Sequence, residues 1–158
     1  MKTLFLHIGT HKTGTKALQN FLSINYEALR SAGVLLPDAG RYEIEPNAFT
    51  PGQHVIAWEL LSGEESPALD ALVAEIDAFG LPAVIVSSEE FHQLHTRPEA
   101  LRTLARRIGE LGYAIKVIVY LRGQARYAES LYSEYAKQSY LSRFEWYIDE
   151  ILSSGTYI

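Results

Sequence analysis

The sequence contains no cysteine and only one methionine among its 158 residues. The lack of cysteine excludes disulfide bonds, thiolate metal sites and a cysteine nucleophile, and it fits a reducing compartment. The chain also lacks any run of about 18 uninterrupted apolar residues, the length that a membrane span requires. Its apolar opening is too short for a signal peptide, because His7 and Gly9 interrupt it. We therefore expect a cytoplasmic protein with no membrane span.

Positive charge is also scarce, since 14 lysine and arginine residues stand against 19 aspartate and glutamate residues. The formal net charge of −5 argues against a broad basic surface, so we expect no nucleic acid among the partners. Hydrophobic residues make up 47% of the chain, which is near the globular average. Because there is no linker or low-complexity segment, residues 1–158 are predicted to form a single domain.

Short apolar runs alternate with segments of helical periodicity along most of the chain. Apolar runs predict strands at residues 3–8, 34–37, 83–87 and 115–121, and the last of these has the longest buried-strand pattern. Helical spacing predicts helices at residues 16–32, 67–79, 96–111, 124–140 and 144–152. Residues 38–63 give a poor pattern, with a helical turn or two at 55–61. This order predicts an α/β fold, a three-layer parallel sheet with helices on both faces.

Two of the predicted helices carry capping signals at their start. Ser66 precedes Pro67 and is predicted to cap the helix that follows. Thr96, with Glu99 three residues on, is predicted to form a capping box.

Polar residues follow three of the predicted strands, and in parallel sheets ligands bind at these carboxyl ends. The first junction is the glycine-containing loop 9–16. It is locally basic, because it contains Lys12 and Lys16 and no acidic residue precedes Glu27. Backbone N–H groups at the start of the next helix suit a phosphate or sulfate group. A nucleoside-triphosphate loop would place lysine directly after its second glycine, whereas Thr15 follows Gly14 here. An ordinary turn with solvated lysines is the alternative interpretation.

The Lys12-Thr13-Gly14-Thr15 core of this loop resembles the 5′-phosphosulfate loop of sulfotransferases that use 3′-phosphoadenosine 5′-phosphosulfate (PAPS). The third junction carries a second resemblance, because the strand ending in Arg122 and the helical Ser130 are similar to that family's 3′-phosphate motif. Arginine can grip two phosphate oxygens, and serine adds a hydroxyl. A structural ion pair of Arg122 with Glu129 or another carboxylate is the competing interpretation.

The resemblance implies a P-loop-like fold and a sulfuryl transfer from PAPS to a hydroxyl or amine. Lys12 would stabilise the bridging oxygen, and Glu89, at the second junction, would accept the proton of the acceptor. A cap on the following turn is the alternative role for Glu89 or Glu90. The implied cofactor-binding residues are His11, Lys12, Thr13, Gly14, Thr15, Lys16, Arg122 and Ser130.

No metal is expected in this scheme. The expected acceptor is a small molecule or a carbohydrate. His54 and Trp58 lie where the family builds its acceptor pocket. Members of the family usually continue with a further strand and a basic loop, so either this chain is a domain truncated at its C-terminus or its adenosine site is completed in another way. A P-loop kinase acting on a small molecule and a non-catalytic nucleotide- or anion-binding module are the alternative functions.

Overall fold

The computed structural model describes residues 1–137 and 143–154, and it is an α/β structure built on a four-stranded parallel sheet. The strand order is β2-β5-β1-β6. The strands of this sheet are β1 (Lys2–His7), β2 (Val34–Leu35), β5 (Ala83–Ser87) and β6 (Tyr113–Ile118). Within the described residues no helix is long and apolar enough to cross a bilayer. The predicted α/β class and the parallel sheet are confirmed.

The helices and the short additional strands fill the connections between these strands. They are α1 (Thr15–Ile24), α2 (Tyr26–Ser31), β3 (Glu43–Glu45), β4 (Ala48–Phe49), α3 (His54–Ser62), α4 (Pro67–Phe79), the 3-10 helix η1 (Glu89–Thr96), α5 (Pro98–Glu110), α6 (Gln124–Lys137) and α7 (Phe144–Ser154). Residues 138–140 of the predicted long helix lie outside the described residues.

The sheet is centred on β1, which pairs in parallel with β5 on one side and β6 on the other. Side chains alternate across a strand, so Leu4 and Leu6 share a face with Val84 and Val86 of β5. All four are buried in one hydrophobic cluster with residues of α3, α4, α5 and η1. This alternation makes one face of the sheet the main core of the protein.

Two helix starts differ from the predicted caps. The side chain of Ser66 does not cap α4; the Glu59 carboxylate accepts the Ala68 N–H at 2.8 Å instead. No capping box forms at α5, because Thr96 is the last residue of η1 and its hydroxyl donates to the Gln93 carbonyl. A carboxylate brought in by another helix is a long-range contact, which a local motif does not reveal.

The segment 38–63, where the sequence pattern is poor, contains a small hairpin and a helix. Antiparallel β3 and β4 are joined through Asn47, whose φ of 64° lies in the left-handed region that asparagine tolerates. Helix α3 follows, and Ile56, Ala57 and Leu60 bury its inner face. The predicted helix at 16–32 is two helices, because the chain leaves helical geometry at Asn25.

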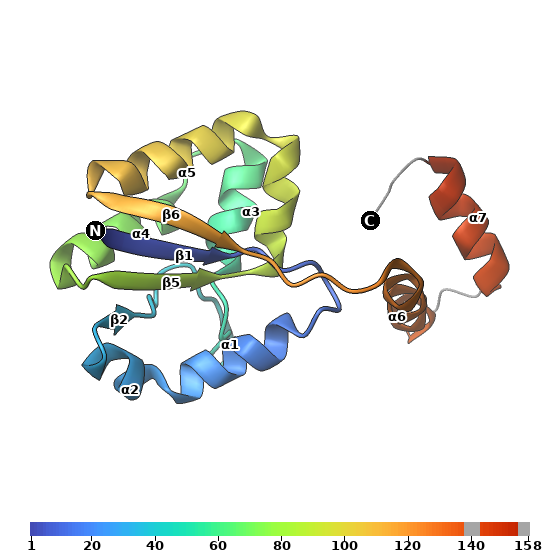
Figure 1. The fold of residues 1–158 in the computed structure, drawn as a ribbon, viewed down its shortest axis with the longest axis horizontal. Helices are drawn as coiled ribbons and strands as arrows, with labels where there is room; N and C mark the ends of the chain where they lie inside the picture. The colour runs from blue at the N-terminus through green and yellow to red at the C-terminus, as the bar shows by residue number, and fades with distance from the viewer. Residues whose placement is uncertain (138–142, 155–158) are drawn as a thin grey trace.

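The predicted burial of the strand at 115–121 is wrong. β6 is an edge strand that ends at Ile118, and Val117 is 58% exposed. Val119 and Leu121 continue this exposed apolar stretch. A run of apolar residues identifies a strand but does not reveal whether neighbours cover it. Figure 1 shows the chain leaving β6 toward α6 and α7, which lie on the side to which the arrowheads of β1, β5 and β6 point.

Candidate functional site

The candidate site is a cavity of about 710 Å³ at the carboxyl edge of the sheet. It is lined by every predicted site residue except Thr13: His11, Lys12, Gly14, Thr15, Lys16, Glu89, Arg122 and Ser130. Leu131, Glu134 and Tyr135 of α6 complete the lining. The fold therefore brings together three strand–helix junctions that are far apart in the sequence.

The loop after β1 leads directly into α1. Gly14 is the residue before the helix and has a φ of 89°, a left-handed value that glycine adopts without strain. Among the described residues no side chain caps α1, so the first N–H groups of the helix have no partner within it. Such groups, together with the helix dipole, favour an anion at this end of the cavity. Thr13 stabilises the loop itself, because its hydroxyl donates to the Thr10 carbonyl at 2.6 Å.

Two buried polar atoms lie under this loop. His7 is 1% exposed, and its Nδ1 lies 2.8 Å from the Ser87 hydroxyl, whereas its Nε2 has no hydrogen-bond partner in the described part of the chain. The buried hydroxyl of Thr15 has none either. Burial lowers the pKa of His7 from its ordinary value of 6.5, although the charge of Glu89 opposes this, so His7 is neutral at pH 7.

Gly9 lets these two side chains approach the loop. A Cβ at this position would lie 2.6 Å from the Thr15 hydroxyl and 3.2 Å from His7 Nε2. Any other residue would therefore displace one of the buried polar groups at the base of the loop.

Arg122 lies against the loop. Its guanidinium donates to the backbone carbonyl of Lys12 at 3.1 Å, and among the described residues it forms no ion pair with Glu129 or another carboxylate. Lys12 adopts a left-handed φ of 64°, and its Nζ lies 3.0 Å from the Glu134 carboxylate of α6. Glu134 was not identified from the sequence, where it resembles any exposed helical glutamate.

The contacts of α6 with the loop perturb two titratable groups. The hydrogen bond and the charge of Lys12 lower the pKa of Glu134, with Lys137 adding to the effect. Burial raises the pKa of Tyr127, and its interaction with Thr10 of the loop opposes this rise. Helix α6 thus contacts the loop at Thr10 and at Lys12.

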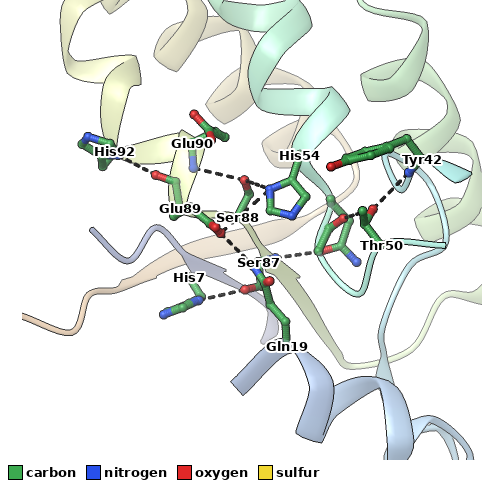
Figure 2. Close-up of polar contacts among 12 residues, drawn as sticks. His7, Gln19, Tyr42, Thr50, His54, Ser87, Ser88, Glu89, Glu90 and His92 are labelled. Atoms are coloured by element: carbon green, nitrogen blue, oxygen red, sulfur yellow. Dashed lines mark hydrogen bonds and ion pairs between the residues drawn. The ribbon is translucent and has the colours of Figure 1, made fainter. Parts of the chain in front are cut away.

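Glu89 begins η1, directly after β5, and its side chain is 22% exposed. Ser88 caps this helix by accepting the Glu90 N–H at 3.1 Å, so the cap is not supplied by Glu89 or Glu90. As Figure 2 shows, Gln19 of α1 donates to Glu89 Oε2 at 3.1 Å. His54 Nδ1 lies 2.9 Å from the Ser88 hydroxyl and 3.9 Å from Glu89 Oε2. Neither Gln19 nor Ser88 is among the site residues predicted from the sequence.

The aromatic residues near Glu89 come from the segment 38–63. His54 stacks with Trp58 at 5.8 Å between ring centroids, and Tyr42 lies 5.3 Å from the Trp58 ring. Tyr42 and Trp58 are exposed, so this group forms an open surface next to Glu89.

A larger cavity, of about 790 Å³, lies between the starts of α4 and α5. Within it, Arg107 is paired with Asp70 at 2.7 Å. Because residues of the loop 9–16, Glu89 and Arg122, which follow β1, β5 and β6, line the smaller cavity and not this one, we place the candidate site at the smaller one. Among the described residues there is no group of three or more histidine, aspartate or glutamate side chains placed to hold a metal.

Comparisons with protein-family models, with curated proteins and with solved structures found no match to this chain.

Proposed function

We propose that the protein transfers a sulfuryl group from PAPS to a hydroxyl or amine acceptor. One observation carries the proposal: the loop 9–16 and the pair Arg122–Ser130 line the same cavity as Glu89. The loop and the pair Arg122–Ser130 suit a donor that carries two phosphate groups. Glu89 suits an acceptor that must lose a proton. The proposal includes a P-loop-like, three-layer arrangement in which β1 carries the loop.

In this proposal the loop holds the 5′-phosphate of the donor. The N–H groups of residues 13–15 and the unpartnered hydroxyl of Thr15 point to this role, with His11 and Lys16 at the rim of the same cavity. Arg122 and Ser130 would hold the 3′-phosphate through charge-assisted hydrogen bonds. Arg122 is exposed, so its guanidinium can reach a ligand while remaining close to the loop.

The chemical step is an in-line displacement at sulfur. The acceptor oxygen or nitrogen forms a bond to sulfur, and the bond from sulfur to the 5′-phosphate oxygen breaks with its electron pair remaining on that oxygen. Lys12 stabilises the developing charge on this oxygen, and Glu89 takes the proton of the acceptor. Lys12 has to exchange its contact with Glu134 for the donor, and the exposure of this ion pair makes the exchange inexpensive in free energy.

Ligand-dependent thermal stability tests the donor. Adenosine 3′,5′-bisphosphate should raise the melting temperature more than AMP does, because Arg122 and Ser130 add contacts to the 3′-phosphate worth about 1.5–3 kcal/mol. Arg122→Ala should abolish the difference between the two ligands and leave the ligand-free protein folded. Equal shifts for both ligands in the wild type would remove the basis for the 3′-phosphate site.

The same assay separates the alternative functions. A larger shift with ATP and magnesium than with the bisphosphate would favour a small-molecule kinase. Binding of the bisphosphate without transfer of labelled sulfate to any carbohydrate, phenol or lipid acceptor would favour a non-catalytic binding module.

A further inference from the structure

We propose that Gln19 is a positioning residue for Glu89. Its hydrogen bond to one carboxylate oxygen, Oε2, leaves the other oxygen, Oε1, free to take the acceptor proton. The inference rests on the proposed function and adds a residue to it. Gln19 is 2% exposed and donates from Nε2 to Glu89 Oε2 at 3.1 Å. A buried side-chain amide that donates to a carboxylate restricts the rotation of that carboxylate.

Helix α1 links this contact to the anion-binding loop. Gln19 lies four residues after Thr15, so the two side chains project from the same face of the helix, and both are buried. Thr15 meets the base of the loop, whereas Gln19 meets Glu89. Helix α1 therefore has two roles in this proposal. Its start faces the donor, and its residue Gln19 fixes the position of the Glu89 carboxylate, which faces the acceptor.

Gly52 makes room for this arrangement. A Cβ there would lie 2.7 Å from Gln19 Nε2 and 2.8 Å from His54 Nε2. The missing side chain therefore allows Gln19 and His54 to approach Glu89 together.

Both neighbours approach the same oxygen of Glu89. Gln19 donates to Oε2, and Oε2 is also the atom 3.9 Å from His54 Nδ1. Among the described residues, no side chain or backbone group donates to Oε1. Figure 2 shows Gln19 and His54 reaching Glu89 from different elements. Oε1 is therefore the oxygen that takes the acceptor proton as the new bond to sulfur forms.

The decisive variant is Gln19→Met, which keeps the length and packing of the side chain but removes its donor. The kcat for sulfuryl transfer should fall about tenfold, the scale of one hydrogen bond to a charged group, while the KM for PAPS stays within twofold. Asn20→Met is the matched control, because it makes a similar change on an exposed position of the same helix and should leave both constants unchanged.

Gly52→Ala gives a second perturbation of the same contact. It should lower kcat to a similar extent, and in the double variant with Gln19→Met the two losses should not add. Unchanged kcat in folded Gln19→Met would overturn the inference. A raised KM for PAPS at unchanged kcat would overturn it too, because Gln19 would then belong to the donor site.

The side-chain amide signals of Gln19 in NMR spectra separate this inference from the proposed function. In the wild type, the hydrogen-bonded amide proton should resonate downfield, and Glu89→Ala should remove that shift. If these signals do not respond to Glu89→Ala, the inference is wrong whatever the activity. If they respond but the wild type forms no sulfated product from PAPS, the contact stands and the proposed function is wrong.

Discussion

Replacing Gly9 with alanine should destabilise the protein through two contacts at the base of the loop. The new Cβ would lie 2.6 Å from the Thr15 hydroxyl and 3.2 Å from two atoms of the His7 ring. Both side chains are buried, and His7 is held by Ser87, so neither can swing into solvent. Overpacking of this kind costs about 1–3 kcal/mol. For a chain of this length that is a fall in melting temperature of roughly 2–4 °C per kcal/mol.

Thermal and urea denaturation of matched glycine variants measure the effect. Gly109→Ala is the control, because a Cβ on this helical residue would meet nothing within 4 Å, and it should stabilise the protein by about 0.5 kcal/mol. Adding Thr15→Ala to Gly9→Ala removes the shorter contact, so the double variant should be more stable than the sum of the single changes predicts. Equal melting temperatures for Gly9→Ala and the wild type would refute this account of the loop.

Two further predictions concern the ion pair above the loop. Lys12→Asn should lower turnover by about 10²–10³ with a smaller loss of donor affinity, and asparagine is chosen because it tolerates the left-handed backbone of this position. Equal losses of turnover and donor affinity would show that Lys12 only binds the donor. Because Lys12 lowers the pKa of Glu134 from its ordinary 4.5, the pair contributes stability above that pH and loses it as the pH falls through the lowered pKa. The urea midpoints of the wild type and Glu134→Gln should therefore differ at pH 7 and converge well below pH 4.5, and a constant difference across this range would contradict the assignment.

Much of the fold could be predicted because its signals are local. The alternation of apolar runs and helical periodicity indicated the parallel sheet, and the glycine of the loop indicated a junction between β1 and α1. The burial of β6 could not be predicted in this way. Apolar residues such as Val117 form a strand whether or not another element packs over them, and coverage depends on the rest of the fold.

The residues of the candidate site also fall into a group that local sequence signals predict and a group that they do not. Residues in the loop and at strand ends could be predicted, because their chemistry and their position in the chain coincide. Gln19 could not, since a glutamine within a helix has no distinguishing local pattern, and only a hydrogen bond across 70 residues of sequence brings it to Glu89. The same holds for Glu134, which meets Lys12 across 122 residues of sequence.

The central position of β1 has a consequence for the order in which the protein can form during synthesis. β1 is made first, whereas its partners β5 and β6 end at residues 87 and 118. At ribosomal rates of about 5–20 residues per second, roughly 5–20 s pass between the synthesis of β1 and the completion of β6. Contacts between such distant segments also slow folding once the chain is complete. The loop that follows β1 is thus synthesised well before the strands on either side of β1, and it is among the last segments to reach its final structure.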